Sequence, residues 1–132
     1  MIKEAYCSFE VAKLLKEKGF DEPCFYYYKD KVLIFSHSLK GRNSYQTDTY
    51  SAPTHQMAMA WLREHGLHIN APISYDYSVD ADGNEVDRRT FYIFEIYSSF
   101  RGNLIYIEEI NEYDSYEEAV EAALKYCLEN LI

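Results

Sequence analysis

Three strand patterns follow one another between residues 73 and 110, and this region constrains the fold more than any other. The first, ISYDYSV, alternates large apolar or aromatic side chains with polar ones, as a half-buried strand does. The turn DADGNE leads into the long strand VDRRTFYIFEIYS, and FRGN leads into LIYIEEI. Strand patterns separated by such short turns predict a three-strand antiparallel meander.

Three amphipathic helices are predicted around this meander. The first runs from about Ser8 to Lys18, and the second from Thr54 to about His65; each starts at a capping residue and ends before a glycine. The third begins at SYEE, a capping box whose first residue is Ser115. Each helix therefore has its own start signal.

The segments CFYYYK and KVLIFS, between the first two helices, are rich in aromatic and β-branched residues and predict a hairpin. The resulting order, α-β-β-α-β-β-β-α, indicates an α+β fold with a mostly antiparallel sheet of about five strands and helices on one face. A chain of 132 residues fits one domain. We expect a single α+β domain over residues 1–132.

One face of such a sheet is expected to stay uncovered. Five strands at about 4.8 Å spacing make a sheet about 24 Å wide, which two or three helices cover on one side only. On the long strand the open side would carry Phe91, Ile93 and Tyr97 beside Glu95. The chain also has 14 tyrosines, a residue favoured at interfaces. We expect a tyrosine-rich sheet face that binds a protein partner or a second copy.

The charge distribution excludes some partners. The net charge is -9, and residues 103–132 alone carry -7. Direct binding to nucleic acid or to an anionic membrane surface is therefore disfavoured, and no apolar run approaches the roughly 18 residues of a membrane span. The start of the chain does not resemble a signal peptide. Together with three cysteines that lack C-x-x-C spacing, this predicts buried free thiols and a cytoplasmic protein.

Metal sites are not predicted. Helical metal ligands need i, i+3 or i, i+4 spacing on one helix face, whereas His55 and His65 are ten residues apart, and Gly66 ends the helix between His65 and His68. The segment DADGNEVD lacks the ligand spacing of a calcium loop and is typical of a hairpin turn.

Catalytic and cofactor motifs are also missing from the sequence. A cysteine nucleophile would require Cys7 or Cys24 to meet a base such as His37, and no local motif indicates this. Glycine-rich phosphate loops and nucleophile elbows do not occur. We predict a non-catalytic protein without a cofactor; an enzyme lacking a recognisable motif is the third hypothesis.

The second hypothesis is a role with nucleic acid. The aromatic sheet could stack bases while basic side chains contact phosphates; the candidates are Lys40, Arg42, Arg88, Arg89 and Arg101. Alternatively, the acidic C-terminal segment could mimic nucleic acid, although the helix dipole already accounts for many of its acids.

Residues 37–52 have no helical or strand period, and a loop this long is usually functional or disordered. If the protein binds a small ligand or anion, we expect it there and at the N-terminus of the second helix, where free amides favour negative charge. The candidate contacts are Arg42, Asn43, Tyr45, Thr54 and His55.

Three segments carry a resemblance: CSFEVAKLLKEKGFDEPC, APTHQMAMAWLRE and YDSYEEAVEAALKYCLENLI. Together they resemble a group of small uncharacterised proteins encoded by gut-bacterial phages and integrated mobile elements. No activity, substrate or cofactor is assigned to that group, so no functional residue carries over. The resemblance implies a bacterial cytoplasm and an accessory role for a phage or prophage.

Overall fold

The computed structural model of the protein describes residues 1–37, 41–100, 103–108 and 111–132. The α-helices within these ranges are α1 (Phe9–Glu17), α2 (His55–Glu64) and α3 (Tyr116–Asn130), and a short 3-10 helix, η1, covers Asn43–Tyr45. The strands are β1 (Tyr26–Lys29), β2 (Val32–Phe35), β3 (Tyr50–Ser51), β4 (Leu67–Asn70), β5 (Ile73–Val79), β6 (Glu85–Tyr92), β7 (Glu95–Phe100) and β8 (Asn103–Glu108).

All three helices begin at their predicted caps. The hydroxyls of Ser8, Thr54 and Ser115 accept hydrogen bonds from the N–H groups of Val11, Met57 and Glu118 at 3.2, 3.2 and 3.1 Å. These bonds satisfy amides that have no partner inside the helix. Gly19 and Gly66 lie just beyond α1 and α2 with φ of +97° and +78°, a backbone conformation that favours glycine. The predicted helix starts and stops are confirmed.

The strands form antiparallel pairs, as expected, and the α+β class is confirmed. Their grouping differs from the single predicted sheet of about five strands. The sheets have the strand orders β2-β1-β3, β4-β7-β8 and β5-β6. The short strands β3 and β4, which the sequence analysis did not predict, complete the first two sheets.

The regrouping comes from a break in the long strand predicted over residues 86–98. It is two strands, β6 and β7, separated by Ile93 and Phe94. Phe94 is almost fully buried, and the N–H of Ile93 donates to the carbonyl of Pro72 at 3.2 Å. Tyr92 pairs with Ile73 of β5 and also bridges to Tyr113, which lies ahead of α3. Burying Phe94 in the core therefore turns the chain, so that β6 leaves with β5 while β7 joins β4.

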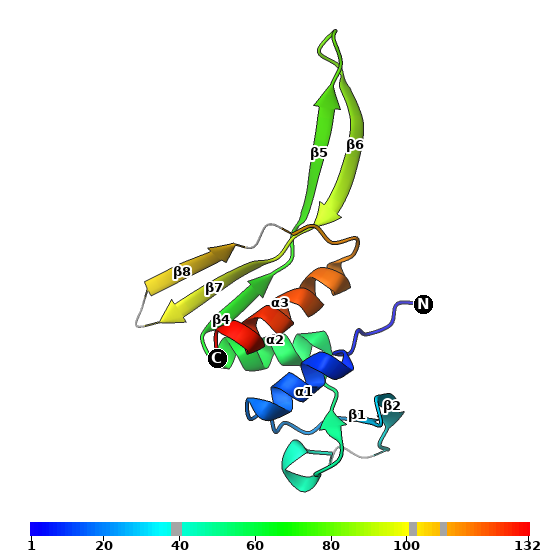
Figure 1. The fold of residues 1–132 in the computed structure, drawn as a ribbon, viewed down its shortest axis with the longest axis vertical. Helices are drawn as coiled ribbons and strands as arrows, with labels where there is room; N and C mark the ends of the chain where they lie inside the picture. Colours follow the sequence, from blue (N-terminus) through cyan, green and yellow to red (C-terminus); the bar gives the residue numbers. More distant parts are fainter. Residues whose placement is uncertain (38–40, 101–102, 109–110) are drawn as a thin grey trace.

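The core lies where the three helices meet β4 and β7 (Figure 1). In that view the helices lie between the β2-β1-β3 sheet and the β4-β7-β8 sheet. Helices α2 and α3 both pack against β4, while α1 packs against α3 and β3. Trp61 of α2 packs edge-on against Phe20, with ring centroids 5.8 Å apart. Large apolar side chains from segments far apart in the sequence thus pack together in one hydrophobic core.

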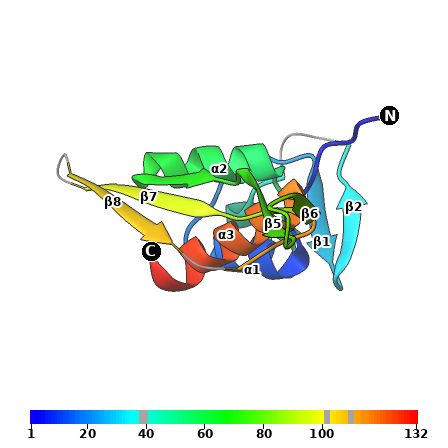
Figure 2. The same ribbon diagram turned by 90° about the horizontal axis from the view of Figure 1, so that it is seen from above.

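Strands β5 and β6 form a long two-stranded ribbon, here called the arm, that projects away from the helices (Figure 1). Figure 2, a view from above, shows the arm nearly end-on. Its tip is the predicted hairpin turn: Asp80 accepts hydrogen bonds from the N–H groups of Asp82 and Asn84, both at 2.9 Å. Gly83 has a φ of +82°, which suits a tight turn. The turn interpretation of DADGNE is confirmed.

Candidate functional site

The arm is built by regular pairing interrupted by one irregularity. Ile73 lies opposite Tyr92 and Tyr75 opposite Thr90, and the register shifts between Asp76 and Ser78. Asp87, on the facing strand, has a positive φ of 52°, as expected at a bulge. Bulges increase the local twist of a ribbon, and neither β5 nor β6 pairs with a third strand among the described residues.

One face of β5 is apolar and uncovered. Alternate residues of a strand share a face, and on β5 this set is Ile73, Tyr75, Tyr77 and Val79. Their exposed fractions are 61%, 54%, 51% and 57%. The rings of Tyr75 and Tyr77 stack with centroids 6.1 Å apart and planes 20° apart. These residues share a face, as their alternation predicts, but they are not covered as in the half-buried strand that the pattern indicates. The structure exposes them because the ribbon projects away from the helices.

Arg88 lies against this apolar face. Its guanidinium is 4.7 Å from the ring centroid of Tyr75, within the range of a cation–π contact. It also donates to the carboxylate of Glu85, and this hydrogen bond is the main reason why the pKa of Arg88 is raised. The positive charge on this face is therefore already paired.

The opposite face of the arm carries ion pairs that link it to the segment before α3. Arg89 binds the carboxylate of Asp76 with two hydrogen bonds of 2.9 and 2.8 Å. It also forms an ion pair of 2.7 Å with Glu112, which precedes α3. Hydrogen bonds to Glu112 and then Asp76 raise the pKa of Arg89. Arg89 thus connects both strands of the arm to the helical body.

The residues predicted for an open sheet face are distributed over different elements. Phe91 belongs to β6, where the guanidinium of Arg89 lies 5.1 Å from its ring centroid. Ile93 lies in the break between β6 and β7. Tyr97 belongs to β7, and its hydroxyl donates to Glu95 at 3.0 Å. Because the long strand is broken, these three residues do not share one face.

The basic residues considered for phosphate contacts are also dispersed. Arg88 and Arg89 each pair with carboxylates, and a guanidinium nitrogen of Arg42 donates to the carbonyl of Asp21 at 3.3 Å. Lys40 and Arg101 lie outside the described residues.

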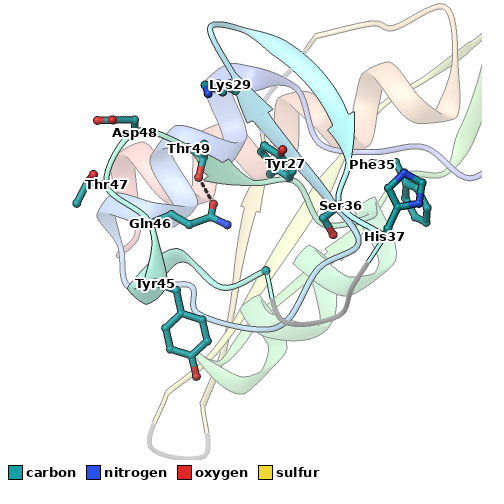
Figure 3. A pocket seen from close by; sticks show the side chains of 11 residues that line it. Tyr27, Lys29, Phe35, Ser36, His37, Tyr45, Gln46, Thr47, Asp48 and Thr49 are labelled. Atoms are coloured by element: carbon teal, nitrogen blue, oxygen red, sulfur yellow. Dashed lines mark hydrogen bonds between the residues drawn. The ribbon is translucent and has the colours of Figure 1, made fainter.

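A hollow of about 730 Å³ lies beside the loop that follows β2 (Figure 3). Tyr45 is at its edge with 70% of its surface exposed, and Figure 3 shows its ring pointing outward. Lys16 orders this loop because its ammonium group donates to the carbonyls of Gln46 and Thr49, both at 2.8 Å. The hollow is lined by polar and aromatic side chains of the loop and of β1 and β2.

The other residues predicted to contact a ligand have structural roles. Asn43 is buried; its side chain donates to the carbonyl of Phe20 at 2.8 Å and accepts from the N–H of Ser51 at 2.9 Å. Thr54 caps α2 and lies with His55 at a separate hollow of about 250 Å³. The structure therefore does not bring the five predicted contacts into one cavity.

His55 has a partner that the sequence did not reveal. Its Nε2 lies 2.6 Å from a carboxylate oxygen of Glu121 on α3, and only 6% of His55 is exposed. The other oxygen of Glu121 accepts the N–H of Ser8 at 2.9 Å. Burial, the largest influence, raises the pKa of Glu121, but the hydrogen bonds from His55 and Ser8 outweigh it, and the pKa is lowered overall. The pair joins the first turns of α1 and α2 to α3.

This pair does not activate a thiol. Cys7 is completely buried, and burial followed by the negative charge of Glu121 raises its pKa well above the ordinary value. Burial also raises the pKa of Cys24 and of Cys127 to about 12. All three cysteines are free and buried, as predicted. Their thiols are protonated near neutral pH, which makes them poor nucleophiles.

The remaining histidines considered as metal ligands lie apart from His55. The Nδ1 of His65 contacts the carbonyl of Trp61 at 2.9 Å, and the Nε2 of His68 contacts the hydroxyl of Ser99 at 3.1 Å. Across the ranges that the structure describes, no cluster of three or more histidine, cysteine or carboxylate side chains could hold a metal ion.

Comparison of the chain with protein-family models, with curated proteins and with solved structures found no match. Within the described residues, no helix is both long enough and apolar enough to cross a bilayer. The candidate functional site is therefore identified from the structure alone. It is the apolar face of the arm, the row of exposed apolar side chains on β5.

Proposed function

We propose that this protein is a non-catalytic interaction protein that binds another protein chain through the apolar face of its arm. The observation that carries this proposal is the row formed by Ile73, Tyr75, Tyr77 and Val79, each more than half exposed. Contiguous exposed apolar surface of this kind marks interaction sites, and tyrosine is enriched at them.

The construction of the arm supports the same proposal. An isolated two-stranded ribbon is only marginally stable in water, because nothing covers its apolar side chains. Here one face is held by Arg89 and its two carboxylates, which leaves the other face presented to solvent. A partner seated on that face would supply the missing burial.

The biological setting is part of the proposal. The resemblance to small phage-encoded proteins supports an accessory role for a phage or mobile element, and three free buried thiols support a reducing compartment such as the bacterial cytoplasm.

The test compares three immobilised proteins: the wild type, the double variant Tyr75→Ser/Tyr77→Ser, and the control Tyr45→Ser. The control removes a tyrosine outside the arm that is more exposed than either of these two. We expect the wild type and the control to retain the same protein species from a bacterial lysate supplemented with tagged copies of the chain, and the double variant to lose them. Retention that is unchanged by the double variant, or a wild type that retains nothing, would contradict the proposal.

A further inference from the structure

The apolar face of the arm has an internal symmetry. Along β5 its side chains follow the order aliphatic, aromatic, aromatic, aliphatic: Ile73, Tyr75, Tyr77, Val79. This order is the same in both directions along the strand, and its centre is Asp76, whose side chain lies on the opposite face with Arg89.

A surface of this kind complements a copy of itself. In a two-fold symmetric interface, if one residue of the first copy contacts a second residue of the other copy, then the same two residues also contact each other with the copies exchanged. With the axis at position 76, Ile73 faces Val79 of a second copy, and Tyr75 faces Tyr77. Aliphatic side chains then meet aliphatic ones, and the stacked tyrosine pair meets another such pair. We infer that the arm binds a second copy of this chain, face to face and antiparallel, which specifies the partner in the proposed function.

The available area determines how tight this dimer is. The four side chains present on the order of 400 Å² of apolar surface per copy, since an aromatic side chain carries about 150–250 Å² and roughly half is exposed here. Two copies bury about 800 Å², and the neighbouring Arg88 and Thr90 bring the total near the roughly 1,000 Å² at which specific interfaces begin. The dimer is weak and reversible, and it forms as the protein concentration rises.

Charge determines how the dimer responds to salt. Each copy carries a net charge of -9, and the tip of the arm contributes Asp80 and Asp82, so the two copies repel each other. Salt screens this repulsion and strengthens apolar burial. Raising the salt concentration therefore tightens the dimer, which is the opposite of its effect on an association driven by ion pairs.

The first experiment measures mass by sedimentation over a wide range of concentrations, at low and high salt. We expect a shift from monomer to dimer in the wild type and in Tyr45→Ser, and at least a tenfold weaker association in Tyr75→Ser/Tyr77→Ser. Circular dichroism establishes that each variant is folded. A strict monomer at every concentration, or a dimer that the double variant leaves unchanged, would overturn the inference.

The second experiment tests orientation with a short bis-maleimide cross-linker and single cysteine variants. The native cysteines are buried and do not compete. A mixture of Ile73→Cys and Val79→Cys proteins is expected to cross-link, whereas either protein alone is not, because its own introduced thiols lie about 20 Å apart in the antiparallel dimer. Ser78→Cys, on the opposite face, is the negative control. Cross-linking of Ile73→Cys to itself would indicate a parallel arrangement and overturn the inference.

The experiments can contradict the antiparallel dimer without contradicting the proposed function. A wild type that stays monomeric but binds a different protein, with loss in Tyr75→Ser/Tyr77→Ser, refutes the self-complementary dimer and leaves the proposed function standing. A wild type that binds neither itself nor another chain refutes both.

Discussion

In both the helical body and the arm, apolar residues recur periodically along the sequence and so share one face. In the body that face is buried, whereas in the arm it is exposed. In the body the apolar stripe of each helix is covered by the other helices, and Leu15, Leu62 and Leu124 are fully buried. In the arm the alternating set centred on Tyr75 and Tyr77 is more than half exposed. Periodicity thus identifies which residues share a face, whereas the path of the whole chain decides what covers that face.

This difference should be visible in stability. Phe94→Ala removes an almost fully buried ring from the core and should lower the free energy of unfolding by about 3–5 kcal/mol. Tyr77→Ala removes an exposed ring from the arm and should change it by no more than about 0.5 kcal/mol in the monomer. Urea unfolding at low protein concentration measures both. Similar losses in the two variants would mean that the arm packs against the body in solution.

The His55–Glu121 pair shows how distant parts of the body depend on each other. Glu121→Gln removes the carboxylate that hydrogen-bonds to buried His55 and accepts the N–H of Ser8, and should cost about 2 kcal/mol near neutral pH. Glu117→Gln, which changes an exposed acid in the first turn of the same helix, is the matched control and should cost only a few tenths of a kcal/mol.

The pH dependence has a definite sign. The folded-state pKa of Glu121 lies below its ordinary value of 4.5, so its carboxylate adds stability that is present above about pH 4.5 and is lost as the pH falls through the folded pKa. The difference in unfolding free energy between the wild type and Glu121→Gln should therefore narrow in acid. If the difference in unfolding free energy between the two proteins stays the same in acid, the charge of the Glu121 carboxylate is not the source of the stabilisation.

Local signals made the helices predictable. Ser8, Thr54 and Ser115 are caps whose effect is confined to the next turn, so the sequence locates the helix starts without knowledge of the fold. The hairpin turn at Asp80 was predictable for the same reason. Strand β4 was not, because only Leu67 and Ile69 of its four residues are buried, too short a run to stand out.

The remaining features depend on distant contacts. The break at Phe94 exists because the core accepts that ring, and no local turn residue announces it. His55 and Glu121 are 66 positions apart, so spacing gives no hint that they meet. The face of the arm was recognised as a set, but its exposure follows from the direction in which the ribbon leaves the body. Phe91, Ile93 and Tyr97 would share one open face only if residues 86–98 formed a single strand, and the break at Ile93 and Phe94 prevents this.

The cap of α2 tests how much a single local hydrogen bond contributes to stability, and the expected effect is smaller than that of Glu121→Gln. Thr54→Ala removes the hydroxyl that accepts the N–H of Met57 and should cost about 1 kcal/mol. Thr47→Ala, an exposed threonine in the loop before β3, should be close to neutral. Thermal or urea unfolding compares the two variants. Equal effects would mean that the first turn of α2 is maintained by its packing alone.

Only a small effect on global stability is expected from the link between the arm and the body. Arg89 binds Asp76 and Glu112, and all three side chains are about half exposed, so solvent screens these ion pairs and Arg89→Gln should change the global stability little. Losing this link should still let the ribbon open more often, because β5 and β6 pair only with each other among the described strands. Amide hydrogen exchange in the arm should then accelerate about two- to fivefold while exchange in the helices stays unchanged.

Arg88→Gln is the control. The ring contact of Arg88 is with Tyr75 and its ion pair is with Glu85, and both of these residues belong to the arm. If both variants accelerate exchange equally, the arm is ordered by contacts along its own strands; if only Arg89→Gln does, its ordering depends on the body, and the apolar face is presented to a partner at a fixed angle.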